Sequence, residues 1–178
     1  MMFKFQHGFA VMRIQPLHNG HRLIIDRMLM ECKKISIVIG SKQESRTVRN
    51  PFTFQERKLM IENIYRDNSR SNDIEILGMD DVGNDDIWYN SVVNLVKNGR
   101  FGMADVYYCG DKVNESYLNR GDFKIVNVDR SKQVGNCNIS ATEIREMVRS
   151  GDENWKKFIP SQNIEYLEKL FGIFDDIN

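Results

Sequence analysis

Cysteine is scarce in this sequence, and its scarcity argues against two common kinds of site. The three residues, Cys32, Cys109 and Cys137, are far apart and odd in number, and no Cys-x-x-Cys pair is present. Neither a disulfide framework nor a cysteine-bound zinc site is therefore supported. Reduced thiols are typical of the cytoplasm, and we predict a cytoplasmic location.

Net charge and long apolar runs are absent as well. Lysine plus arginine and aspartate plus glutamate number 25 each, so no overall field attracts nucleic acid or an anionic membrane. Lys4, Gln6 and His7 interrupt the amino-terminal apolar stretch, which argues against a secretory signal. No apolar run approaches the length that spans a membrane. We expect no nucleic acid or membrane as a partner, and any anion binding must be local.

Length and patterning predict one α/β domain over residues 1–178, with a helical carboxy-terminal part from about residue 140. Strand-like runs occupy residues 5–12, 35–39, 73–77, 105–109 and 123–128. Helical patterns cover residues 23–32, the segment after the Thr53 capping box, and residues 87–96, 113–118, 140–149 and 162–171. Strands separated by helices favour parallel pairing through right-handed crossovers. The predicted fold class is therefore a doubly wound, Rossmann-like parallel sheet followed by carboxy-terminal helices.

The segment His18-Asn19-Gly20-His21 lies at the turn between the first strand and the first helix. Such turns lie at the carboxyl end of a parallel sheet, where helix amides favour phosphate. Gly20 would let the backbone approach a phosphate, and the two imidazoles would donate to it. Two alternatives stay open. One is a metal pair, which lacks a third ligand at suitable spacing, and the other is a pair of surface histidines without a role. The isolated His7 is expected to be structural.

A second motif, Ser140-Ala141-Thr142-Glu143, forms a capping box at the start of a helix. Any helix needs a cap, so the box alone says little about function. Arg145 says more, because a cation in the early turns opposes the helix macrodipole. Charge-assisted hydrogen bonds to a polyphosphate would offset that unfavourable placement.

Two further loops are expected at the same edge of the sheet, where loops often carry function. The loop over residues 40–53 contains Arg46 and Arg49, which could equally be a solvated pair. The acidic loop over residues 80–86 leads to Trp88. That indole could either pack in the core or stack on a flat cationic ring.

Together these segments resemble the archaeal-type nicotinamide-nucleotide adenylyltransferases over nearly the whole chain, from about residue 5 to residue 160. The matching motifs are Arg13-x-Gln15-Pro16-x-His18-x-Gly20-His21, Gly40-Ser41-x-Gln43, Arg49-Asn50-Pro51-Phe52-Thr53-x-x-Glu56-Arg57, Trp88, and Ser140-x-Thr142-Glu143-x-Arg145. His-x-Gly-His alone is shared by the nucleotidyltransferase superfamily, which includes phosphopantetheine adenylyltransferase. The loop that runs into Arg-Asn-Pro-Phe-Thr narrows the resemblance to the nicotinamide branch.

The resemblance implies a reaction in which ATP and nicotinamide mononucleotide give NAD and pyrophosphate, without a covalent intermediate. It implies that Mg²⁺ arrives with ATP, that the protein has no metal site of its own, and that the chain forms a homo-oligomer. The implied catalytic residues are His18, His21 and Arg145. The implied ATP-binding residues are these three with Arg13, Gln15, Gly20, Gly110, Asp111, Ser140 and Thr142. The implied mononucleotide-binding residues are Gly40, Ser41, Arg49, Phe52, Val82, Asp85 and Trp88.

The sequence departs from the family pattern at two positions, with Met12 where glycine is usual and Asp85 where an amide is expected. The Asp85 carboxylate could attract the cationic nicotinamide ring or weaken recognition of its amide. Two other functions remain as alternatives. One is another transferase of the superfamily, such as the phosphopantetheine type, which does not call for Arg49 or Trp88. The other is a module that senses NAD or ATP without turnover.

Overall fold

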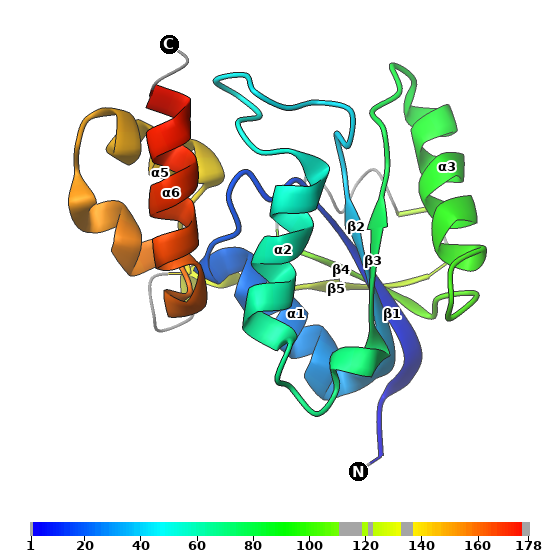
Figure 1. Cartoon of the computed structure of the whole chain (residues 1–178). Helices are drawn as coiled ribbons and strands as arrows, with labels where there is room; N and C mark the ends of the chain where they lie inside the picture. Colours follow the sequence, from blue (N-terminus) through cyan, green and yellow to red (C-terminus); the bar gives the residue numbers. More distant parts are fainter. Residues whose placement is uncertain (1, 111–118, 121–122, 133–136, 176–178) are drawn as a thin grey trace.

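The computed structural model describes residues 2–110, 119–120, 123–132 and 137–175, and its centre is a five-stranded parallel sheet (Figure 1). The strands are β1 (Phe5–Met12), β2 (Cys32–Ile39), β3 (Ile74–Gly78), β4 (Val106–Cys109) and β5 (Lys124–Asn127). Their order in the sheet is β3-β2-β1-β4-β5, with parallel pairing at every step. The predicted strands and fold class are confirmed.

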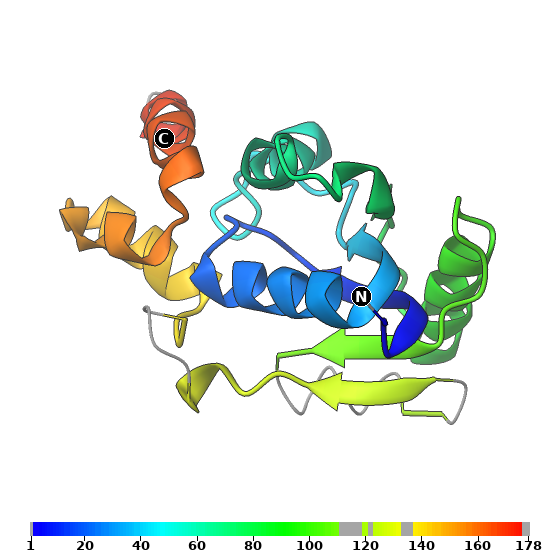
Figure 2. The same cartoon turned by 90° about the horizontal axis from the view of Figure 1, so that it is seen from below.

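Helices cover both faces of the sheet, as Figure 2 shows from below. They are α1 (Asn19–Glu31), α2 (Phe54–Tyr65), α3 (Asp85–Lys97), α5 (Ala141–Arg149) and α6 (Ile164–Asp175). One core cluster unites α1, α2, α5 and α6 with one face, and a second joins α3 to the other. In β2, Ile37 faces the first cluster and Val38 the second, which explains its unbroken apolar pattern. The predicted helix over residues 113–118 lies outside the described residues.

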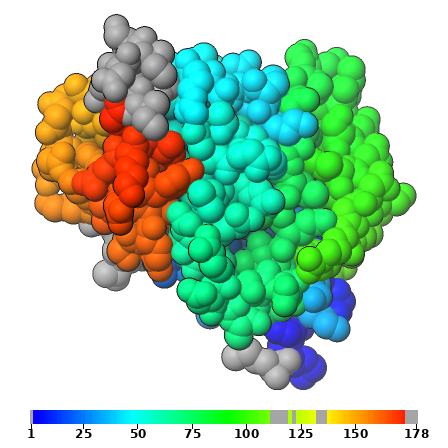
Figure 3. All heavy atoms as spheres, in the orientation of Figure 1, coloured from blue at the N-terminus to red at the C-terminus, as the bar shows by residue number. Residues whose placement is uncertain are grey.

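Helix α6 lies beside α2, and Figure 3 shows its red-orange spheres directly next to those of α2. Asn163 is fully buried and makes the connection specific. Its side-chain amide donates to the carbonyl of Met60 at 2.8 Å, and its oxygen accepts from Asn63 at 3.1 Å. Among the described residues, no helix is long and apolar enough to cross a membrane.

Candidate active site

A cavity of about 410 Å³ opens at the carboxyl edge of the sheet, where the segments after all five strands meet. Met12 and Arg13 come from the end of β1, and Gly40 from the end of β2. Gly110 and Arg130 reach the cavity from the segments that follow β4 and β5. The chain order reverses between β1 and β4, and ligands of open parallel sheets bind at such a switch point. The topology therefore identifies this cavity as the candidate active site.

The two histidines of the His-x-Gly-His motif are stacked, with ring centroids 3.8 Å apart. His18 is the N-cap of α1, and its Nδ1 accepts a hydrogen bond from the amide of Gly20 at 3.1 Å. The Nδ1 of His21 accepts in turn from the amide of His18 at 3.4 Å. In a neutral imidazole, one nitrogen accepts and the other carries the proton. Each ring therefore holds its proton on Nε2, which leaves that N–H as the group able to meet an anion.

Only one of these histidines reaches the cavity. His21 lines its wall, whereas the side chain of His18 is buried beneath the turn. Burial, reinforced by the positive charge of Arg130, lowers the pKa of His21 from 6.5 to about 3. Burial, with contributions from His21 and Arg130, also holds the pKa of His18 well below its usual value. Both rings are therefore neutral donors at physiological pH.

Acidification is expected to destabilise the ligand-free protein. The folded-state pKa values of His18 and His21 lie below the ordinary value of 6.5, so the unfolded chain takes up protons first. The stabilisation is fully present above pH 6.5 and is lost as the pH falls, for His21 by about 1.4 kcal/mol per pH unit down to its folded-state pKa of about 3, and for His18 in the same direction. Urea denaturation at pH 7.5 and pH 5.5 measures this loss. Equal free energies of unfolding at the two values would contradict the assignment of neutral, buried histidines.

Gly20 is required for a reason that differs from the predicted one. A Cβ at this position would lie 2.7 Å from the carbonyl oxygen of Cys137 and 2.9 Å from Cε1 of His18. The residue is buried, and the close approach is made by the protein's own backbone. Glycine is therefore required here by the packing of the fold itself, and the approach of the Gly20 backbone to a phosphate stays a prediction.

A second cavity, of about 480 Å³, gathers four arginines beside the first. They come from the end of β1 (Arg13), the loop after β2 (Arg49) and helix α5 (Arg145 and Arg149). Arg145 reaches across the chain and donates to the carbonyl of Gln15 at 2.6 Å. Burial, followed by the charges of Arg149 and Arg13, lowers the pKa of Arg145. Mutual repulsion of this kind favours a polyanion, and Arg13 lines both cavities.

The two cavities divide the predicted residues differently from the substrate sets implied by the resemblance. Arg49 lies with Arg145 and Thr142 of the ATP set, whereas Trp88 lies with His21 in the other cavity. The predicted sets therefore meet in space, but each cavity contains members of both.

Several predicted residues do not line either cavity. Gln15 and Phe52 are buried and bind each other, the Gln15 amide donating to the Phe52 carbonyl and accepting from its N–H, both at 2.9 Å. They therefore support the site from beneath, and their predicted contacts with ligands stay predictions. Ser140 caps α5 through the amide of Glu143. Val82 and Asp85 are exposed on the loop and first turn of α3, and Asp111 lies outside the described residues.

Comparisons with known proteins agree with this geometry. Residues 13–147 match the family model described as Cytidylyltransferase-like. The chain is 30% identical over 170 residues to a "Nicotinamide-nucleotide adenylyltransferase" of Archaeoglobus fulgidus, covering 93% of this chain and 92% of that protein. It is 31% identical over 166 residues to a protein of the same name from Picrophilus torridus, with the same coverage of each. The chain belongs to the nicotinamide-nucleotide adenylyltransferase family.

A solved structure has the same fold as this chain. The crystal structure of a bifunctional NMN adenylyltransferase/ADP ribose pyrophosphatase from Francisella tularensis superposes with a TM-score of 0.81 at 24% identity. The match covers 97% of this chain and 52% of that one, so this chain spans about half the length of the bifunctional protein. A second structure of that protein is described as complexed with AMP and a Mn ion.

The sequence did not identify two residues that line the site of this chain. Arg130 lines the main cavity and begins a short 3₁₀ helix soon after β5. The sequence feature that could have indicated Arg130 is its position shortly after a predicted parallel strand. Asp81 also lines the cavity, and it accepts from the hydroxyl of Ser41 at 2.6 Å and from its amide at 3.2 Å. Ser41 is thereby held at the cavity wall by a neighbouring loop.

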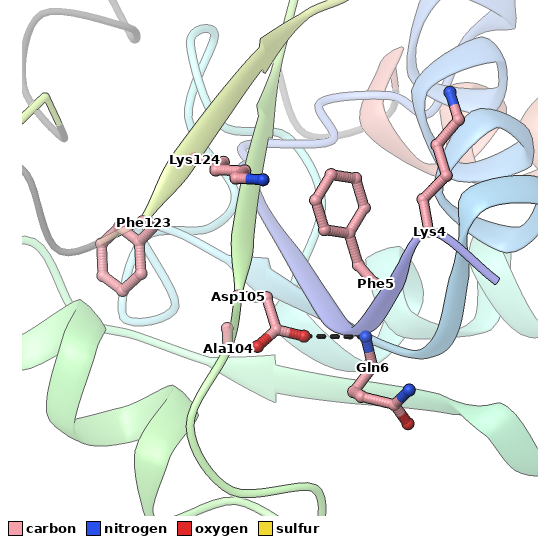
Figure 4. A pocket seen from close by; sticks show the side chains of 7 residues that line it. All are labelled: Lys4, Phe5, Gln6, Ala104, Asp105, Phe123 and Lys124. Carbon is pink, nitrogen blue, oxygen red and sulfur yellow. Dashed lines mark hydrogen bonds between the residues drawn. The ribbon is translucent and has the colours of Figure 1, made fainter.

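A larger cavity of about 680 Å³ lies at the opposite, amino edge of the sheet (Figure 4). Its walls include Lys4, Phe5 and Lys124. The carboxylate of Asp105 there already accepts from the amides of Gln6 at 2.7 Å and His7 at 3.0 Å. Parallel sheets bind ligands at the carboxyl edge, so size does not make this cavity the family's active site.

No group of three His, Cys, Asp or Glu side chains is arranged to hold a metal within the described part of the chain. In the main cavity, the Asp81 carboxylate is engaged by Ser41.

Proposed function

We propose that this protein joins the adenylyl group of ATP to nicotinamide mononucleotide, forming NAD and releasing pyrophosphate. One observation carries the proposal: His21 and five arginines, brought together from distant segments, line two cavities that share Arg13. A phosphate oxygen of the mononucleotide attacks the α-phosphorus of ATP in line. The bond from that phosphorus to the bridging oxygen breaks, and pyrophosphate leaves with the electron pair.

The physical obstacle is repulsion between two polyanions, so positioned positive charge must supply much of the rate. We assign the Nε2–H of His21 and the guanidinium of Arg145 to the triphosphate, close to the charge that develops on the leaving group. Arg13 can reach both substrates because it lines both cavities. Arg130 adds a further cation beside His21. His18 supports His21 from beneath and is the least exposed member of this group.

Mg²⁺ is proposed to enter with ATP and to leave with pyrophosphate. It would neutralise part of the triphosphate charge, which is the usual task of such an ion in phosphoryl transfer. The Mn ion named for the Francisella tularensis structure supports the use of a divalent ion by a protein of this fold. Arg49, Gly40 and Ser41 are proposed to bind the mononucleotide, and Gly110 to lie near adenosine.

The direct experiment mixes the purified protein with ATP, Mg²⁺ and nicotinamide mononucleotide and measures NAD and pyrophosphate together. Equal amounts of the two products are expected. Replacing the acceptor with nicotinic acid mononucleotide or phosphopantetheine then defines the substrate. Turnover only with phosphopantetheine would assign a different transferase, and tight NAD binding without turnover would assign a sensor. We also propose that the protein is cytoplasmic and forms a homo-oligomer. Light scattering would measure its oligomeric state.

Trp88 provides a separate prediction about the acceptor. It lies in α3 and is half-buried. Its side chain packs against the second core cluster and lines the main cavity. Stacking of an indole on a cationic ring contributes about 0.5–2 kcal/mol. The Trp88→Ala variant is therefore expected to raise KM for nicotinamide mononucleotide about tenfold, while KM for ATP changes little. The Trp88→Phe variant should keep most of the affinity, and equal changes in both KM values would contradict a stacking role.

A further inference from the structure

Arg57 is a buried cation whose hydrogen-bond acceptors, among the described residues, are all backbone carbonyls. It lies on α2, and its side chain is fully removed from solvent. Nη1 donates to the carbonyls of Arg13 at 2.8 Å and Gly40 at 2.7 Å. Nη2 donates to the carbonyl of Ser41 at 2.9 Å, and Nε to that of Thr53 at 3.3 Å. One guanidinium thus connects the ends of β1 and β2 to the start of α2.

Such an arrangement is costly for the fold. A buried charge loses its hydration, and a carboxylate partner would normally compensate part of that loss. The desolvation is evident in the pKa of Arg57, which burial and the nearby charge of Arg13 lower to about 10, although the Asp81 carboxylate raises it in part. Stability alone therefore gives a poor reason for a cation at this position, since an apolar side chain of similar size would avoid the penalty.

The carbonyls that Arg57 binds belong to the segments that form the wall of the main cavity. Arg13, Gly40 and Ser41 all line that cavity. Two residues of these segments have left-handed backbone conformations that side chains disfavour, Ile14 with φ of 54° and Ser41 with φ of 50°. Each such conformation costs about 1–3 kcal/mol and persists only where its surroundings enforce it. The guanidinium of Arg57 donates to the carbonyl of Arg13, the residue before Ile14, and to the carbonyl of Ser41 itself.

We propose that Arg57 is a positioning residue of the active site, which fixes the strained segments after β1 and β2 and adds a buried positive charge behind the bound polyanions. This inference rests on the proposed function. The planar fork of arginine can meet carbonyls from three segments at once, whereas the single nitrogen of lysine cannot. Correct placement of Arg13 and of the cavity wall then depends on a residue that touches no substrate.

The Arg57→Lys variant tests this role, because it keeps the charge and loses the fork. We expect kcat for NAD formation to fall about 10- to 100-fold, the effect of small displacements of reacting groups. The matched control is Arg70→Lys. Arg70 also donates to backbone carbonyls, those of Cys32 at 2.9 Å and Lys33 at 2.6 Å, but at the amino edge of the sheet. The control should lower the melting temperature and leave kcat within about twofold, with both variants assayed well below their melting temperatures.

Equal loss of kcat in both variants, or unchanged kcat in Arg57→Lys, would overturn the proposal. If Arg57→Lys does not fold, the wild-type protein supplies the test through ¹⁵N spectra of its arginine side chains. Pyrophosphate should shift the Nε resonance of Arg57 and leave that of Arg70 in place, and an unmoved Arg57 signal would refute the role. If the wild-type protein makes no NAD, the proposed function fails separately. The role of Arg57 is then measured by pyrophosphate affinity, expected to weaken about tenfold in Arg57→Lys alone.

Discussion

Replacing His21 with alanine is expected to lower kcat about 10²- to 10³-fold, the range for removing one preorganised donor from a transition state. The reason is the Nε2–H that the hydrogen-bond pattern assigns to this ring, together with its place on the cavity wall. Because its pKa is lowered to about 3 in the ligand-free protein, His21 is a neutral ring at pH 7 and can donate through its Nε2–H. Steady-state rates of NAD formation at saturating substrates measure the effect.

Two control variants separate this role from stability. The His21→Gln variant keeps an N–H donor near the position of Nε2 and should recover part of the lost rate. The His7→Ala variant removes a buried histidine bound to Ser36 and Gly102, at 2.9 Å and 3.0 Å, near the amino edge of the sheet. It should lower the melting temperature while kcat stays close to that of wild type. Activity of His21→Ala within a few-fold of wild type would remove His21 from the mechanism.

The fold was readable from the sequence because its signals are local. The two capping boxes predicted at Thr53 and Ser140 are present, each with reciprocal hydrogen bonds to the third residue of its helix. The alternation of strand-like and helical segments predicted all five strands, and buried strands such as β2 have apolar side chains on both faces. The boundaries differ by a few residues where a 3₁₀ turn, Ser161–Asn163, precedes α6.

The site was less predictable because its decisive contacts join distant segments. The bond from Arg145 to the carbonyl of Gln15 spans 130 positions, and no spacing rule indicates it. The pairing of Gln15 with Phe52, which are 37 positions apart, also follows no spacing rule, so the sequence did not indicate that these two side chains bind each other. The close approach of the Cys137 carbonyl to Gly20, which excludes a side chain there, likewise joins segments far apart in the chain and could not be predicted. Arg130 was missed because it belongs to none of the motifs that the resemblance contains.

The Arg145→Ala variant is expected to lower kcat/KM for ATP by about three orders of magnitude, a loss of the kind seen when a transition-state arginine is removed. Arg145 donates through Nη1 to the Gln15 carbonyl and through Nη2 to the Thr142 hydroxyl at 3.1 Å, so its guanidinium is already oriented before substrate arrives. Orientation in advance avoids reorganisation during the reaction, and that is the source of the large effect. Rates measured over a range of ATP concentrations test the prediction.

Arg149 supplies the matched comparison, because it lies one helical turn beyond Arg145 on α5 and lines the same cavity. Its side chain is exposed, and water and salt therefore screen its charge. The Arg149→Ala variant should raise KM for ATP only a few-fold, with the increase diminishing at high ionic strength. If the two alanine variants lost activity equally, a diffuse positive field would explain catalysis, and a precisely held Arg145 would be unnecessary. A large loss confined to Arg145 would instead require contact between its guanidinium and the leaving phosphates.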